Sequence, residues 1–522
     1  MENKKKIGLV SIYPSRPHVE HLAFITNKLV NLGYDLYHLS YKGTFELDYA
    51  KFHKNTFGKI LETFKARYGG LYGYHRIRTT FLEDITKETY DHERSKDLCF
   101  SSASTLLRVE QISDTQDKQF KDLVTQLSKG VSLTVPAVRK WISDNQIEKV
   151  ICFNGRIDLT AAVMQACRDE KIKFISLERS WFGEGIQLLE GDNCLGLDSV
   201  NRMMQDWINK PLNERQLKKV SNLMLDRIEK KLNSEFRIYN KEEKSRPWPA
   251  KGARKFLFLP STNCETWDHK DHLSRWTNSL EACDYMASKL NIQPSEIVVR
   301  AHPQWAMTIR GIDGSCHINF YKDWCEKRGY LYIPPQDEIS TVELMKESDC
   351  VILNGSSAGL EAGFLGIPIV LISPANYAQG EFTMNIFSKE EADNKLSGDK
   401  FLKFLEKDNK QKALRAIYTI IYRYFQFTDQ IRLLNSHETE YRTGNSKGLI
   451  SLIETGQLIS DDEEYFEDDS LELTYISKLS SFSVGERFSI SDNNRSATYK
   501  IKRKGLYKLI DLISEFLPLS AR

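Results

Sequence analysis

The chain has 522 residues, of which 41% are hydrophobic and 28% are charged. That length predicts two domains, each with enough apolar residues to bury a core. The formal net charge is only +2, so charge gives no reason to expect nucleic acid or another polyanion as a partner.

The nine cysteines are scattered, with no CxxC pair and no Cys/His cluster at zinc spacing. This pattern favours a reducing compartment and argues against a metal site. The opening segment, MENKKKIGLVSIYPS, lacks the apolar core of a signal peptide, and no stretch approaches about 20 apolar residues. We therefore expect a cytoplasmic protein without a membrane-spanning helix.

The chain opens with a βαβ pattern of Rossmann type. Strands are predicted over residues 6–12 and 35–40, with a helix over 18–32 between them. Arg16 and His18 lie in the first turn, at a strand end where open α/β sheets place ligands. Ordinary surface-loop positions are the alternative for both residues. Residues 49–145 show no clear strand alternation, which indicates a mostly helical insertion.

Two further strands end in polar residues. The strand 149–153 is followed by Asn154 and Arg156. The strand 173–177 is followed by Glu178 and Arg179, with Glu184 six residues beyond Glu178. Because the carboxyl ends of such strands meet at one edge of the sheet, we expect these side chains at a crevice.

A second run of strands and helices follows the charged, proline-containing segment 237–252, which reads as a domain boundary. Strands are predicted over 255–259, 296–300 and 330–333. The first two are followed by polar residues, which are Thr262 and Asn263 after the first and His302 after the second. The third is followed by the stiff pair Pro334 and Pro335.

The segment 349–372 is the clearest unit of this second half. It reads as a buried strand, a turn at Gly355, a short helix and another buried strand. Ser356 and Ser357 stand where the helix begins, and free backbone N–H groups and the helix dipole favour an anion there. A nucleotide phosphate is our interpretation, and simple helix capping by Ser356 is the alternative.

These patterns predict an α/β protein with two Rossmann-type domains that face a central cleft. We expect residues 1–240 to form the first domain, with its helical insertion at about 49–145. The second domain is expected to span residues 253–458. Residues 459–522 would then form an acidic break and a basic, amphipathic tail.

The order of several motifs resembles the bacterial capsule polysaccharide biosynthesis family, which includes Kdo transferases of the GT-B type. The motifs are Asn154-Gly155-Arg156, the Glu178 region, His302-Pro303 and the run from Ser356-Ser357 to Gly359-Leu360-Glu361-Ala362. They cover roughly residues 148–200 and 255–385. One departure concerns the acidic motif, which in the family has two acids and a glycine but here reads Leu177-Glu178-Arg179-Ser180.

The resemblance implies a glycosyltransferase that works without a metal or other cofactor. It assigns the catalytic base to Glu178, with Glu184 as the alternative carboxylate, and places His302 on the donor phosphate. The residues expected to hold the nucleotide are Gly355, Ser356, Ser357, Glu361, Thr262, Asn263 and Pro335, together with His302. The residues expected to meet the acceptor or the sugar are Asn154, Arg156, Arg179 and Arg16.

The favoured donor is a CMP-activated ulosonic acid, because an arginine fork suits a sugar carboxylate. The acceptor would be a growing capsule polysaccharide, lipopolysaccharide or another glycolipid. A UDP- or GDP-sugar transferase, a sugar 2-epimerase and a non-catalytic capsule-assembly scaffold are the other interpretations.

The tail at 499–519 combines a basic cluster with apolar residues at helical spacing. This pattern is typical of a segment that lies in the interface of a membrane. Docking on the protein's own core or on a second subunit is the alternative.

Overall fold

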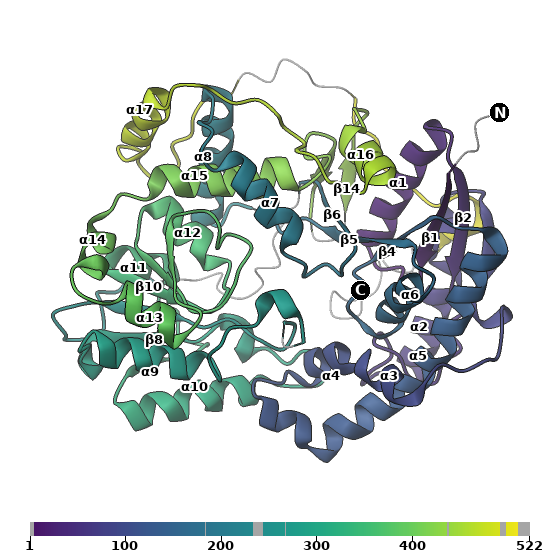
Figure 1. Ribbon diagram of the computed structural model, residues 1–522, viewed down its shortest axis with the longest axis horizontal. Coiled ribbons are helices and arrows are strands. Elements are labelled where there is room, and N and C mark those ends of the chain that lie inside the picture. Colours follow the sequence, from purple (N-terminus) through teal and green to yellow (C-terminus); the bar gives the residue numbers. More distant parts are fainter. Residues whose placement is uncertain are drawn as a thin grey trace.

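The structure is a computed structural model that describes residues 5–182, 184–232, 244–266, 268–435, 438–490 and 497–509. Two α/β domains lie side by side, each built on its own sheet of six strands (Figure 1). Among the described residues, no helix is both long and apolar enough to cross a membrane.

The first sheet has the strand order β3-β2-β1-β4-β5-β6. Its strands are β1 (Lys6–Ser11), β2 (Asp35–Ser40), β3 (Arg78–Phe81), β4 (Lys149–Phe153), β5 (Lys173–Arg179) and β6 (Ile186–Glu190). Neighbouring strands are parallel except β6, which pairs antiparallel with β5. Alternate residues of β1 enter different cores, with Ile7 and Leu9 on one face and Val10 on the other, because side chains alternate along a strand.

Helices cover both faces of this sheet. The helix α1 (His18–Asn31) packs into the core of Leu9, whereas α5 (Lys118–Asn145) and α6 (Asp158–Asp169) pack into the core of Val10. The chain between β2 and α5 adds α2 (Thr56–Tyr68), α3 (His92–Asp97) and α4 (Phe100–Leu107). The insertion is thus mainly helical, but β3 was not expected within it. This strand is short and lies at the sheet edge, where its half-exposed residues make no apolar run.

The second sheet has the order β12-β11-β10-β7-β8-β9, and all its strands are parallel. The strands are β7 (Phe256–Leu259), β8 (Ile297–Arg300), β9 (Leu331–Ile333), β10 (Cys350–Leu353), β11 (Ile369–Leu371) and β12 (Thr383–Asn385). The helices between and after them are α9 (Ser279–Lys289), α10 (Ser315–Arg328), α11 (Thr341–Glu347), α12 (Ala358–Leu365), α13 (Lys389–Lys395) and α14 (Lys400–Glu406). The predicted α/β class with two Rossmann-type domains is confirmed.

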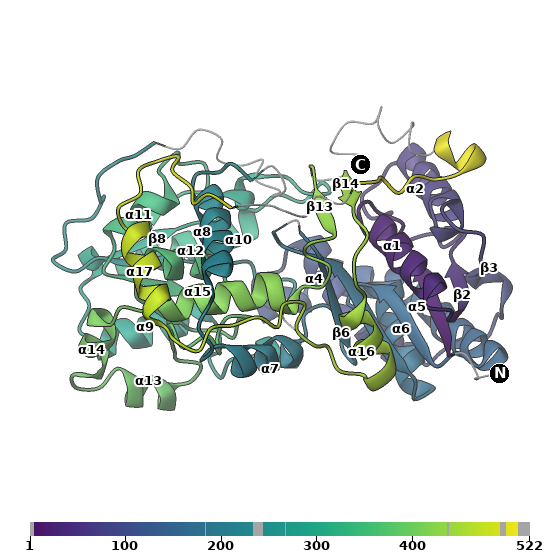
Figure 2. The same ribbon diagram turned by 90° about the horizontal axis from the view of Figure 1, so that it is seen from above.

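The chain then returns to the first domain. The helix α15 (Lys410–Tyr418) continues as a π-helical turn, Thr419–Tyr424. The hairpin β13 (Ile431–Leu433) and β14 (Thr439–Tyr441) and the helix α16 (Lys447–Thr455) lie beside α1 (Figure 2). The Tyr441 ring stacks on Phe24 of α1 at 5.0 Å. These elements pack on the first domain, although the sequence had assigned residues up to 458 to the second.

Three more helices lie near the junction of the domains. They are α7 (Asp198–Trp207), α8 (Glu214–Ile228) and α17 (Ser470–Leu479). Contacts join α7 to the π-helical turn and join α8 to both α15 and α17. Residues from both sheets share one continuous apolar cluster with these helices, so the two domains are packed together rather than merely linked.

The described part of the tail docks on the first domain. Tyr499 pairs with Tyr441 through backbone hydrogen bonds, and the Arg503 guanidinium is buried and donates to the Gly69 carbonyl. Lys500 lies 3.7 Å from Glu438. Part of the basic cluster that we had assigned to a membrane interface therefore packs on the protein itself, because the side chains of Lys500 and Arg503 have partners there. The rest of the predicted amphipathic segment, residues 510–519, lies outside the described residues.

Candidate active site

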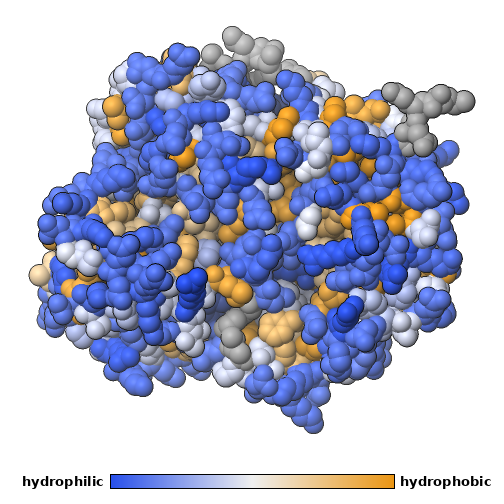
Figure 3. Space-filling view, viewed as in Figure 1, coloured by the Kyte–Doolittle hydropathy of each residue, from blue (hydrophilic) through white to orange (hydrophobic). Residues whose placement is uncertain are grey.

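A cavity of about 530 Å³ lies where the two domains meet. This is within the size range of small-molecule sites, roughly 300–1,000 Å³. The face shown in Figure 3 is largely hydrophilic, and apolar residues show mainly in its recesses. The polar and charged residues that line the cavity include Arg179, Ser180, Arg227, Lys230, Ser261, His272, Arg300, His302, Ser356, Ser357, Glu361 and Asn376. Six of these twelve side chains carry basic groups and one is acidic, which favours an anionic ligand.

The start of α12 forms one wall of this cavity. Gly355 has a φ of +95°, a value that suits glycine and turns the chain sharply after β10. The Ser356 hydroxyl accepts a hydrogen bond from the Ala358 N–H, whereas Ser357 makes no capping bond with its side chain. Ser356 and Ser357 both line the cavity at the start of the helix, where the positive end of the helix dipole favours a phosphate.

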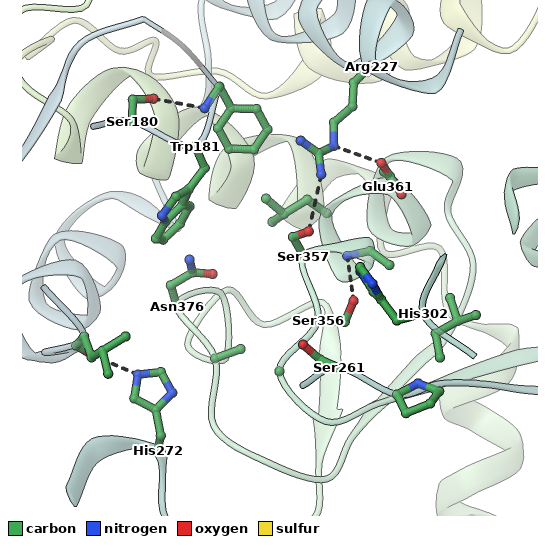
Figure 4. A pocket seen from close by; sticks show the side chains of 18 of the residues that line it. Ser180, Trp181, Arg227, Ser261, His272, His302, Ser356, Ser357, Glu361 and Asn376 are labelled. Atoms are coloured by element: carbon green, nitrogen blue, oxygen red, sulfur yellow. Dashed lines mark hydrogen bonds and ion pairs between the residues drawn. The ribbon is translucent and has the colours of Figure 1, made fainter. Parts of the chain in front are cut away.

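His302 follows β8 and lies near Ser356 and Ser261 (Figure 4). Its Nδ1 accepts a hydrogen bond from the Gln304 N–H at 3.2 Å. In the neutral ring this places the proton on Nε2. His302 is therefore oriented as a hydrogen-bond donor at the cavity, as the predicted phosphate contact requires.

Glu361 is held by a residue that the sequence did not single out. Arg227, on α8, donates to Glu361 Oε1 at 2.9 Å, and both side chains are buried. The same guanidinium lies 3.4 Å from the Ser357 hydroxyl (Figure 4). We had expected Glu361 to meet a ribose hydroxyl, but its closest described partner is this cation, which links α8 to the start of α12.

Glu178 lies at the end of β5, directly before the cavity residues Arg179 and Ser180. It accepts hydrogen bonds from His18 Nε2 and from Asn154 Nδ2. Burial by itself raises the pKa of the Glu178 carboxyl, but the charge and hydrogen bond of His18, together with the bonds from Asn154 and the Arg179 N–H, lower it to about 2. A carboxylate of such low pKa accepts a proton poorly near neutral pH.

His18 changes how this cluster is interpreted. Because Nε2 donates to Glu178, the neutral ring keeps its lone pair on Nδ1. Nδ1 has no hydrogen-bond partner among the described residues. The pair resembles the carboxylate–imidazole arrangement in which the acid orients a basic histidine. The signal in the sequence was the position of His18 after β1, where open α/β sheets place ligands, although its pairing with Glu178 was not predicted.

The other predicted carboxylate lies away from the cavity. Glu184 is not among the lining residues, and the charges that affect it are those of Lys219 and Asp429. Burial raises the pKa of its carboxyl. Neither carboxylate lines the cavity, but Glu178 directly precedes the lining residues Arg179 and Ser180 and stays the favoured one.

Three of the residues predicted to bind the acceptor make internal contacts. The Arg156 guanidinium is buried and donates to the hydroxyls of Ser101 and Thr105, so it ties α4 to the sheet. Asn154 supports Glu178 as described above. Arg16 pairs with Glu20, one turn further along α1. The geometry therefore assigns Asn154 and Arg156 to support of the site, and of the four predicted residues only Arg179 lines the cavity.

The predicted nucleotide residues Thr262, Asn263 and Pro335 do not line the cavity either. Thr262 accepts a hydrogen bond from the Trp305 indole, and Asn263 donates to Glu110. Ser261, one residue earlier, takes their place at the cavity. Pro335 lies in a loop held by Arg300, which donates to the carbonyls of Pro334 and Asp337.

One cluster of possible metal ligands occurs among the described residues: Asp192, His269 and Asp271. His269 Nδ1 accepts from the Asp271 N–H, which leaves the ring proton on Nε2, 3.4 Å from Asp192. Asp192 and His269 thus approach each other across the junction of the domains. None of the three residues lines the cavity.

No protein-family model matches the sequence, and no curated protein matches it either. Among solved structures, the chain is similar to the Thermosulfurimonas dismutans KpsC beta Kdo 2,4 transferase, at 13% identity and a TM-score of 0.33 over 64% of this chain and 87% of that one. It is also similar to the beta Kdo 2,7 transferase of the same KpsC, at 12% identity and a TM-score of 0.34 over 66% and 90%. A UDP-GlcNAc 2-epimerase from Methanocaldococcus jannaschii is 12% identical, with a TM-score of 0.27 over 80% of this chain and 99% of that one.

Proposed function

We propose that this protein is a glycosyltransferase that moves a sugar from a nucleotide-activated donor to a growing surface polysaccharide or glycolipid. The observation that carries the proposal is the convergence of His302, Ser356 and Ser357 on one cavity between two Rossmann-type domains. Donors of this kind stabilise the charge that develops on a leaving phosphate. The reaction needs no metal ion if these groups take that charge.

In the proposed reaction an acceptor hydroxyl attacks the anomeric carbon as the bond from that carbon to the phosphate oxygen breaks. The bonding electrons leave with the phosphate, next to His302 and Ser356. The hydroxyl proton is assigned to the His18–Glu178 pair, which adjoins the lining residue Arg179. Because His18 Nδ1 is buried, a water molecule would relay the proton to it, with Glu178 stabilising the imidazolium. This assigns the base function to a residue pair, whereas the sequence had assigned it to Glu178 alone.

The favoured donor is a CMP-activated ulosonic acid such as Kdo or a sialic-acid-like sugar. The motif order that resembles the capsule polysaccharide biosynthesis family supports this choice. The excess of basic residues at the cavity supports it as well, because such a donor brings a carboxylate in addition to its phosphate. Arg179, which lines the cavity, is the guanidinium group that we assign to that carboxylate, because Arg227 is already paired with Glu361.

The test is a thermal-shift titration with CMP, CDP, UDP and GDP, since a ligand that binds only the native state raises its melting temperature. We expect CMP to give the largest shift and His302→Ala to reduce it. A largest shift with UDP or GDP would overturn the donor choice while leaving nucleotide binding intact. No shift with any nucleotide would overturn the enzymatic proposal and favour a scaffold.

A further inference from the structure

The helix α2 (Thr56–Tyr68) exposes an apolar face. Phe57, Ile60 and Phe64 have exposed fractions of 73%, 62% and 38%. With a helical repeat of 3.6 residues, these three positions fall on one side of the helix together with Leu61 and Tyr68, which are half-buried. The only fully buried residue of the helix is Ala66 on the other side. The helix is thus held by its small residues and presents its large apolar side chains to solvent, the reverse of an ordinary surface helix.

Basic residues outnumber acids near this face: Lys54, Lys65 and Arg67 lie toward its edges, whereas Lys59 falls on the opposite side of the helix. From residue 54 to residue 68 the chain carries four basic residues, Lys54, Lys59, Lys65 and Arg67, and one acid, Glu62. Glu62 pairs with Lys65 on the same helix. The whole protein has a formal net charge of only +2, so this excess is local.

The described part of the tail adds to the same region. Its turn Gly505–Tyr507 lies next to α2 in Figure 2. Tyr507 contacts Tyr72, which follows the end of α2, with ring centres 5.2 Å apart. The tail residues Lys502, Lys504 and Lys508 are exposed, and Leu509 is exposed as well. Docking of the buried Arg503 on Gly69 therefore brings further lysines and another apolar side chain to the end of the helix.

We propose that the α2 face, defined as Phe57, Ile60 and Phe64 with their basic surroundings, docks on an anionic lipid surface. An apolar stripe flanked by lysine and arginine is the pattern of helices that lie in the interface of a membrane. The apolar side chains enter the acyl boundary, and the cations meet the lipid phosphates and remain hydrated. An excess of positive charge around an apolar face favours an anionic membrane over a protein partner of ordinary polarity. This surface does not depend on the chemistry at the cavity.

The experiment is co-sedimentation of the full chain with vesicles. One set contains phosphatidylcholine with about a third phosphatidylglycerol, and the other contains phosphatidylcholine alone. We expect the chain to bind the anionic vesicles. Because salt screens the attraction between the basic residues and the lipid phosphates, this binding should weaken as the salt concentration is raised. The variant Phe57→Ser/Ile60→Ser/Phe64→Ser should lower the partition coefficient by about tenfold or more, because its inserted apolar area is lost.

Matched controls distinguish membrane binding by the α2 face from nonspecific hydrophobic binding and from effects of unfolding. Leu402→Ser and Leu473→Ser remove apolar side chains of similar exposure, 58% and 54%, from other helices and should leave binding unchanged. Because the three α2 side chains are exposed, their substitution should also leave the melting temperature unchanged. Lys54→Gln/Arg67→Gln, which removes two cations next to the α2 face, should reduce binding at low salt.

Three outcomes would overturn the proposal. The first is a wild-type chain that ignores anionic vesicles at low salt. The second is a triple variant that binds as well as the wild type. The third is a concentration-dependent dimer in the absence of vesicles that the triple variant abolishes, since the α2 face would then join two copies of the chain.

Discussion

The Glu110 carboxylate of the first domain lies 2.7 Å from Nδ1 of His317 in the second domain, and both side chains are fully buried. The same carboxylate accepts from the Tyr321 hydroxyl at 3.0 Å and from Asn263. His317 and Tyr321 stack with Trp305, three residues beyond His302. The insertion thus joins the domains and supports the loop that carries His302.

Substitution of Glu110 by Ala should destabilise the protein strongly. It leaves the buried polar groups of His317 and Tyr321 without this partner, and breaking a buried charged network in this way typically costs about 3–5 kcal/mol. The measurement is chemical denaturation followed by tryptophan fluorescence. Glu93→Ala, at a side chain that is 77% exposed, is the control and should change stability little. Equal, small effects in the two variants would show that the network does not stabilise the junction.

Substitution of His302 by Ala should lower turnover by about a hundredfold or more, as expected when one preorganised transition-state donor is lost. The melting temperature should stay close to that of the wild type because the side chain lies at the cavity. Steady-state kinetics with the donor identified by the nucleotide titration is the measurement. His302→Gln, which keeps a donor N–H, should retain more activity than His302→Ala. Full activity in a folded His302→Ala chain would remove this residue from the reaction.

Glu178 and His18 should behave as one unit. Either Glu178→Gln or His18→Ala should abolish most transfer while leaving the thermal shift by nucleotide nearly unchanged, because the phosphate contacts lie in the second domain. The double variant should be scarcely worse than either single one. An active His18→Ala chain together with an inactive Glu178→Gln chain would return the base function to Glu178 alone.

The pH dependence of stability provides a separate test of Glu178. The pKa of its carboxyl is about 2 in the folded protein and ordinarily near 4.5, so its ionised form stabilises the fold. This contribution is fully present above about pH 4.5 and is lost as the pH falls through 2, and it amounts to on the order of 3 kcal/mol. The stability difference between wild type and Glu178→Gln should therefore shrink between pH 5 and pH 2. A difference that stays constant over this range would contradict the lowered pKa.

Arg227 should stabilise the folded protein through its ion pair with Glu361. Arg227→Met leaves Glu361 buried without its cation, so we expect a loss of about 3 kcal/mol or more of stability. Arg227→Met combined with Glu361→Gln should recover part of that loss, because the unpaired charge is removed. Thermal unfolding of the three variants measures this. If the double variant is as unstable as the sum of the two single ones, the two residues are not coupled.

Much of the fold could be predicted from the sequence because it depends on local pattern. Five strands are short apolar runs bounded by polar turns, which is the sequence pattern of strands buried on both faces: β1, β4, β5, β8 and β10. The edge strand β3 was missed, since the half-exposed residues RTTF make no such run. The end of the second domain was also misplaced, because β13 and β14 carry no mark of which domain they will pack on.

The candidate site could likewise be predicted only in part from the sequence. His302, Ser356 and Ser357 follow directly from their strands and from the start of α12, and local geometry is enough to bring them to the cavity. The partner of Glu178 is 160 positions away, and that of Glu361 is 134 positions away. Only the tertiary structure shows that Arg156, Thr262 and Asn263 make internal hydrogen bonds instead of lining the cavity. It likewise shows that Arg227, His272 and Asn376 do line the cavity. The reason is physical: a polar side chain becomes structural or functional according to which distant groups satisfy its hydrogen bonds, and packing of the whole chain selects those groups.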